Sequence, residues 1–207
     1  MGLTTDSIAG ANSIMRRTAH WQVPVALAAA SIAAELGGTT LRGVLRFDRE
    51  AIANGELWRL LTGHFVHLGV SHMLLNVGAM MLIWLLVGQG LNLHRWLMVI
   101  AACLAGIDLS FWYFDPQLSW YVGLSGLLHG MLAAGLAAQF RMAPRESLVL
   151  GCLLAGKIVY EQVAGAMPGS EFSAGGPVVV NAHLYGAIAG LVAGLLLRGG
   201  DRASEPI

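Results

Sequence analysis

The stretch VNAHLYGAIAGLVAGLLL, residues 180–197, decides the class of this protein. It contains no Asp, Glu, Lys or Arg. A transmembrane helix needs about 20 predominantly apolar residues, and this stretch comes close to that length. Five more apolar stretches precede it, at Trp21–Leu36, His72–Val87, Leu97–Phe114, Val122–Phe140 and Leu148–Ala164. The sequence therefore predicts an all-α membrane protein with six transmembrane helices.

The composition of the whole chain agrees with this class. Of the 207 residues, 56% are hydrophobic and 12% are charged, whereas a soluble domain carries about a quarter charged residues. The formal net charge is zero, which gives no support for a nucleic-acid partner. Cys103 and Cys152 lie in apolar stretches without metal-ligand spacing. We therefore expect no disulfide, metal site or cofactor.

The segments outside the apolar stretches set the domain organisation. We expect residues 1–20 to be a cytoplasmic segment, residues 21–198 the membrane domain and residues 199–207 a cytoplasmic tail. Residues 37–71 are too long and too charged for a plain linker. This first loop is expected to lie in the membrane interface, with Trp58 at the level of the headgroups.

Basic residues predict the orientation. With both termini in the cytoplasm, seven of the twelve Lys and Arg residues are cytoplasmic, four lie in the external first loop and one lies within a helix. The positive-inside rule favours this arrangement. An apolar run after Arg16 and Arg17 loosely imitates a signal peptide, but the spans that follow favour a retained first helix.

This topology brings polar residues from three helices to one depth. The second, fourth and sixth helices run from outside to inside, so their first turns lie in the outer leaflet. His72 and Asn76, Ser125, and His183 lie near those ends, within roughly 10 Å at about 1.5 Å per residue. Membrane proteins rarely retain ionisable groups in spans without a function.

Ser125 and His183 can form a nucleophile and its base. A serine hydroxyl attacks only when a base removes its proton, and Gly123 and Gly126 leave the hydroxyl of Ser125 exposed. By itself, a Gly-Ser-Gly patch more often only packs membrane helices together. However, small residues recur every four positions along both helices, as Gly126, Gly130 and Ala134 and as Gly186, Gly190 and Gly194. If these stripes face each other, His183 can reach Ser125 as a general base.

The other polar residues of the spans permit two interpretations each. His72 and Asn76 share a helix face and could donate hydrogen bonds to an oxyanion, or they could be a structural polar pair. Lys157 and Glu161 could neutralise each other within the bilayer or line the entry of a substrate. Asp108 needs a partner that the sequence does not identify.

Three blocks of the sequence resemble the rhomboid family of intramembrane proteases. They are ELWRLLT at residues 56–62, followed by His67, His72 and Asn76; GLSG at residues 123–126; and AHLYG at residues 182–186. The resemblance implies a six-helix rhomboid-like bundle with an interfacial first loop. It also implies Ser125 as nucleophile, His183 as base, His72 and Asn76 as oxyanion donors, and no third, orienting carboxylate.

His129 departs from the family pattern, in which an aromatic residue, often Tyr, follows the serine by four positions. We expect its imidazole to replace the Tyr ring as the surface that stacks on His183. The alternative is that His129 tunes the proton affinity of His183 or touches the substrate.

The short chain and the run GLSGLLHG, residues 123–130, resemble the rhombosortase branch of the family. That resemblance implies a substrate anchored by a C-terminal Gly-Gly motif, an apolar helix and basic residues. It also implies a bacterial inner-membrane protein surrounded by lipid, with an active site that opens to the periplasm.

Two other functions stay open at this point. A rhomboid-fold protein could bind or dislocate membrane segments without cutting them, although such proteins typically lack the Ser or the His. A small transporter could be built around Lys157, Glu161 and Asp108, but it would not explain the shared depth of Ser125, His183 and Asn76.

Overall fold

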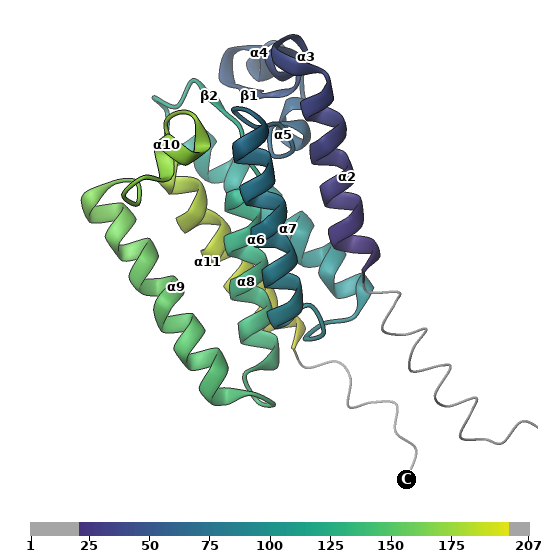
Figure 1. Cartoon of the computed structure of the whole chain (residues 1–207), viewed down its shortest axis with the longest axis vertical. Helices are drawn as coiled ribbons and strands as arrows, with labels where there is room; N and C mark the ends of the chain where they lie inside the picture. Colours follow the sequence, from purple (N-terminus) through teal and green to yellow (C-terminus); the bar gives the residue numbers. More distant parts are fainter. Residues whose placement is uncertain (1–20, 199–207) are drawn as a thin grey trace, which may run out of the picture.

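Six long helices form the body of the protein in the computed structural model, which describes residues 21–198 (Figure 1). The predicted terminal segments 1–20 and 199–207 lie outside these described residues, together with the basic residues assigned to them. The long helices are α2 (Gln22–Leu36), α6 (Val70–Val87), α7 (Leu93–Phe114), α8 (Ser125–Gln139), α9 (Pro144–Ala164) and α11 (Val180–Leu197).

The predicted count of six spans is not confirmed. Within the described residues, α6, α7, α9 and α11 are long and apolar enough to cross a membrane. Helix α2 qualifies only with α3 (Gly38–Leu45), from which it is bent by 117°. Helix α8 has 15 residues, or about 22 Å at 1.5 Å per residue. It is therefore shorter than a bilayer core of about 30 Å.

Hydropathy predicts that this helix begins at Val122. Helix α8 begins instead at Ser125, because the preceding segment is extended. Trp120–Tyr121 forms strand β2, which pairs antiparallel with strand β1, Phe47–Asp48. The backbone N–H of Gly123 then donates to the carbonyl of Gly63 over 3.2 Å. These contacts tie the start of α8 to the first loop.

Helix α8 lies at the centre of the bundle, against α6, α7, α9 and α11. Ten of its 15 residues are buried, so it is a helix that protein surrounds rather than lipid. The predicted contact between the small-residue stripes is confirmed. A Cβ on Gly186 or Gly190 would come within 3.0 Å of the backbone of Gly126 or Gly130, respectively. No residue larger than glycine fits at these two positions.

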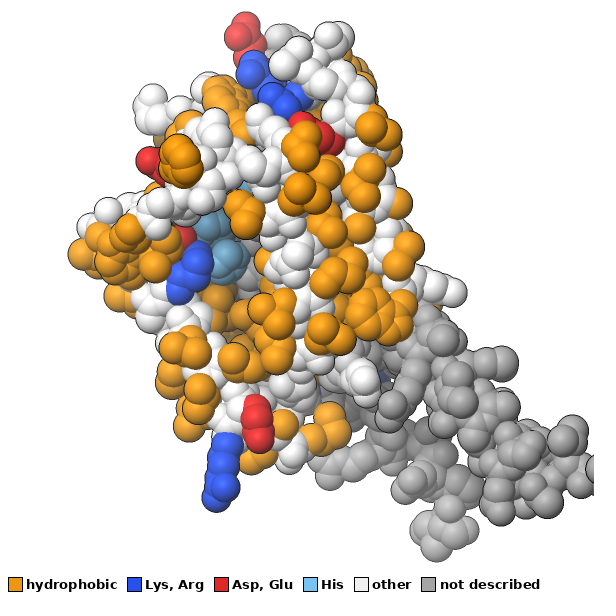
Figure 2. Space-filling model, viewed as in Figure 1, with side chains coloured by type: hydrophobic (Ala, Val, Ile, Leu, Met, Phe, Trp, Pro, Cys, Tyr) orange, Lys and Arg blue, Asp and Glu red, His pale blue; other side chains and the backbone are white. Residues whose placement is uncertain are grey.

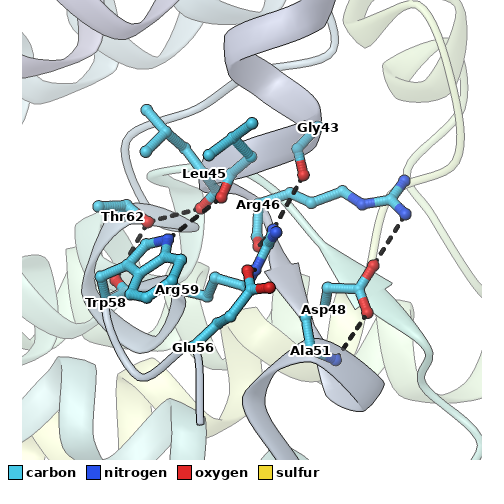
Figure 3. Close-up of polar contacts among 10 residues, drawn as sticks. Gly43, Leu45, Arg46, Asp48, Ala51, Glu56, Trp58, Arg59 and Thr62 are labelled. Carbon is cyan, nitrogen blue, oxygen red and sulfur yellow. Dashed lines mark hydrogen bonds and ion pairs between the residues drawn. The ribbon is translucent and has the colours of Figure 1, made fainter. Parts of the chain in front are cut away.

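The first loop is folded into three short helices, α3, α4 (Arg49–Ala53) and α5 (Arg59–Thr62), with β1 between α3 and α4. Arg59 holds the loop together (Figure 3). Its guanidinium binds Glu56 at 2.7 Å and donates to the carbonyls of Gly43 and Arg46 at 2.9 and 3.0 Å. The indole of Trp58 donates to Val44 and is half exposed.

Candidate active site

Ser125 and His183 meet at the N-terminal end of the contact between α8 and α11. Ser125 is the first residue of α8, and His183 lies in the first turn of α11. The Oγ of Ser125 and the Nε2 of His183 are 2.9 Å apart, which is a hydrogen bond. His183 is buried. The glycine stripes explain this distance, because they let the two backbones approach where side chains would hold them apart.

A carboxylate binds the other nitrogen of His183. The Nδ1 atom lies 2.9 Å from Oε2 of Glu161 on α9. The expectation of a site without an orienting carboxylate is therefore wrong. The spacing of Glu161 in the sequence showed only that it shares a face of α9 with Lys157. The structure shows that this face is directed at His183 on α11. A sequence signal did exist, since Glu161 lies in the last turn of its helix, which the predicted topology places at the same depth as Ser125 and His183.

The predicted ion pair between Lys157 and Glu161 is present. The Nζ atom of Lys157 lies 2.6 Å from Oε1 of Glu161 and 3.5 Å from Nδ1 of His183. The side chain of Glu161 is 2% exposed and that of Lys157 is 34% exposed. Glu161 thus faces the protein interior and does not line an entry, whereas Lys157 reaches the surface of a cavity.

His129 stacks on His183, as expected from the position of the usual aromatic ring. The ring centroids are 4.2 Å apart and the planes differ by 15°. The Nδ1 atom of His129 lies 2.7 Å from the backbone oxygen of Ser125. Because a carbonyl can only accept, this nitrogen carries the proton. His129 is therefore held in one orientation beneath the imidazole of His183.

His72 lies close to Ser125, next to Gly123. The N–H of Leu68 donates to Nδ1 of His72 over 3.4 Å, so Nε2 carries the proton when the ring is neutral. A Cβ on Gly123 would lie 3.2 Å from the His72 ring and 3.9 Å from Oγ of Ser125. Gly123 has φ of +129°, a region that favours glycine. It thus permits both the turn and the close approach of the two side chains.

Asn76 lies one helical turn beyond His72, and its amide nitrogen donates to the His72 carbonyl at 3.1 Å. Asn76 and Ser125 line the same cavity of about 280 Å³ between α6, α8 and α9. The rest of its wall is mostly leucine and alanine, with Lys157 at one side. Figure 2 shows histidine side chains in a hollow beside α9, next to a basic side chain.

Two further histidines support the loop before the serine. His64 pairs with Asp108 at 3.2 Å, which supplies the partner that the sequence did not identify. Burial lowers the pKa of His67 to about 3, so this side chain is neutral at pH 7 as it packs against His72. Burial raises the pKa of Tyr121, whose hydroxyl donates to the carbonyl of Gly123.

One cluster among the described residues has the composition of a metal site. Ligand atoms of His129, Glu161 and His183 lie within 4.8 Å of one another. However, the two imidazoles are stacked and nearly parallel, so their lone pairs do not converge on one point. Both nitrogens of His183 already have hydrogen-bond partners. The orientation of the two rings therefore does not favour coordination of one ion by both of them.

Comparison with known proteins identifies a matching family. The Rhomboid domain family matches residues 54–200, well over half of the chain. Rhomboid protease GluP of Bacillus subtilis (strain 168) is 33% identical over 102 residues, which are 47% of this chain and 20% of GluP. The chain thus covers about a fifth of that relative's length. The matched domain and the apolar helices identify this chain as an integral membrane protein that belongs to the rhomboid family.

Proposed function

We propose that this protein is an intramembrane serine endopeptidase with Ser125 as nucleophile and His183 as general base. The observation that carries the proposal is the 2.9 Å hydrogen bond between Oγ and Nε2, at the edge of a cavity. Membership of the rhomboid family supports the same reaction class. A hydroxyl beside a buried imidazole is the arrangement that activates a serine.

The reaction proceeds through an acyl-enzyme. As Oγ of Ser125 attacks the peptide carbonyl, His183 accepts the serine proton at Nε2. His183 returns this proton to the leaving amine when the C–N bond breaks, and the acyl group remains on Ser125. Water then attacks the ester, gives a proton to His183, and the serine recovers that proton when the carboxylate product leaves.

We assign three donors to the oxyanion of the tetrahedral intermediate. The backbone N–H of Ser125 lies in the first turn of α8, where helix N–H groups have no intrahelical partner. The Nε2–H of His72 and the amide of Asn76 come from α6. In known enzymes one such donor stabilises the transition state by about 3–4 kcal/mol.

The length of α8 supports cleavage below the membrane surface. A helix of about 22 Å that ends at the inner face of a core of about 30 Å begins about 8 Å below the outer face. We infer that Ser125 acts at this depth and that the site opens to the periplasmic side of the bacterial inner membrane. Both termini are then cytoplasmic, consistent with the distribution of basic residues.

We further propose that the substrate is a protein anchored by a C-terminal tail of the rhombosortase type. The resemblance of GLSGLLHG, residues 123–130, supports this class. A Gly-Gly motif outside an apolar helix unwinds at low cost, since glycine is a poor helix former. It can therefore present an extended peptide bond to Ser125. Removal of the tail would release or re-anchor the substrate.

Cleavage of a membrane-anchored reporter in proteoliposomes tests the reaction. We expect Ser125→Ala and His183→Ala to abolish cleavage. The matched control is Ser147→Ala, which removes another buried serine hydroxyl from a helix of the same bundle and should leave cleavage intact. Undiminished cleavage by Ser125→Ala would exclude the proposed nucleophile.

The substrate class needs a second pair of reporters. One carries Gly-Gly before an apolar helix and a basic tail, and the other carries Val-Val at the same positions. We expect cleavage beside Gly-Gly and little cleavage beside Val-Val. Equal cleavage of the two reporters would remove the support for a rhombosortase-type tail while leaving the protease proposal intact.

A further inference from the structure

Glu161 contacts the nitrogen of His183 that faces away from Ser125. Its Oε2 atom lies 2.9 Å from Nδ1, and Ser125 lies 2.9 Å from Nε2 of the same ring. The four groups Lys157, Glu161, His183 and Ser125 therefore form one continuous chain of polar contacts. They come from three helices, α9, α11 and α8.

The carboxylate controls which nitrogen of His183 carries the proton. An ionised carboxylate can only accept hydrogen bonds, so Glu161 requires a proton on Nδ1. Nε2 is then unprotonated and able to accept the proton of Ser125. The ammonium of Lys157 lies 3.5 Å from the same Nδ1. If Lys157 were the donor to Nδ1, the proton would be on Nε2 and the base would be blocked. The shorter contact is the one to Glu161.

The charges of the cluster explain how a carboxylate is kept in the membrane. A buried carboxylate without a partner is costly, and Glu161 is 2% exposed. Lys157 neutralises it in the resting state through Oε1. This leaves Oε2 for His183. A pair that served only to neutralise charge would not require the second carboxylate oxygen to be directed at the imidazole.

We propose that Glu161 is a positioning residue for His183, with Lys157 as its counter-ion. It fixes the tautomer of the base and stabilises the imidazolium that forms during attack, the part that an aspartate plays in soluble serine proteases. This inference rests on the proposed protease function and assigns a third member to its catalytic group.

Several charged or titratable groups lie around His183. Glu161 and Lys157 approach from α9, His129 stacks from α8, and His72 on α6 lies beside Gly123, near the hydroxyl of Ser125. Directly after α7, Asp115 accepts a hydrogen bond from the amide of Asn181 at 2.8 Å and is therefore engaged elsewhere. Two of these groups carry opposite formal charges at pH 7, so their removal has opposite effects.

The test measures the rate of labelling by a fluorophosphonate probe from about pH 5 to pH 9 in detergent, for folded protein only. In wild type we expect the rate to fall at low pH, because a protonated general base cannot accept the serine proton. Glu161→Gln should lower the plateau by about 10²-fold or more and shift the acidic midpoint to lower pH, because the imidazolium loses its anion. Lys157→Gln should shift the midpoint to higher pH, because a neighbouring cation is lost. Glu161→Asp should retain more activity than Glu161→Gln.

The matched control is Asp108→Asn, which removes another carboxylate paired with a histidine, His64, outside the site. We expect it to lower thermal stability but to leave the acidic midpoint in place. Labelling of Glu161→Gln at the wild-type rate and midpoint would overturn the inference. A lower rate with an unchanged acidic midpoint, in Glu161→Gln or in Lys157→Gln, would also overturn it. If Glu161→Gln does not fold, the midpoint of Lys157→Gln and the labelling rate of Glu161→Asp test the inference in its place. Labelling that persists in Ser125→Ala would instead refute the proposed function itself.

Discussion

Gly186→Ala tests whether the glycine stripes set the geometry of the site. A Cβ at this position would overlap the carbonyl oxygen of Gly126 and would lie 2.7 Å from its carbonyl carbon, compared with at least 3.4 Å for ordinary contact. The helices must therefore separate by at least about 0.7 Å where His183 meets Ser125. That displacement would stretch the contact of 2.9 Å to about 3.6 Å, which is no longer a hydrogen bond.

We expect two effects of this substitution. Overpacking costs about 1–3 kcal/mol of stability, and a misplacement of about 1 Å lowers a rate about 10²-fold. Fluorophosphonate labelling and thermal denaturation in detergent measure the two effects. Gly151→Ala on α9 is the control, since a Cβ there meets nothing within 4 Å; it should label at the wild-type rate. Wild-type labelling and stability in Gly186→Ala would refute the close contact of the stripes.

Three further predictions concern the neighbours of the dyad. Asn76→Ala should lower kcat of reporter cleavage about 10²-fold with little change in KM; a change confined to KM would remove Asn76 from the oxyanion site. His129→Phe should retain cleavage and His129→Ala should lose part of it, because the stacking ring contributes about 0.5–1.5 kcal/mol; equal activities would contradict a role for the ring. The lowered pKa of His67, about 3, means that the unfolded chain takes up a proton below about pH 6.5 and the folded chain does not. Stability should therefore fall as pH drops below 6.5, less so in His67→Gln, and identical pH profiles of thermal unfolding would contradict this.

The sequence predicted the features that depend on helical periodicity. Gly186 and Gly190 recur at four-residue spacing, and the structure places them against the matching stripe of α8. The pairing of Lys157 with Glu161 follows from the same spacing, since residues four apart share a helix face. Periodicity within one helix is thus enough to identify which residues share a face and which side chains on that face can pair.

Contacts across the fold were not accessible in the same way. Nothing in the spacing of Glu161 shows that its face of α9 points at His183. The pairing of Asp108 with His64 joins a span to the first loop, at a separation of 44 residues. Helix α8 begins later than hydropathy predicts because β2 and Gly123 hold the preceding segment extended. Hydropathy therefore placed the start of α8 three residues too early.

The most direct test of the proposed chemistry is to map the fluorophosphonate adduct by tandem mass spectrometry. Wild-type protein should carry one adduct, on Ser125, and His183→Ala should carry almost none, because the hydroxyl is then without its base. An adduct on a different residue, or an adduct on Ser125 that forms equally fast in His183→Ala, would contradict the dyad.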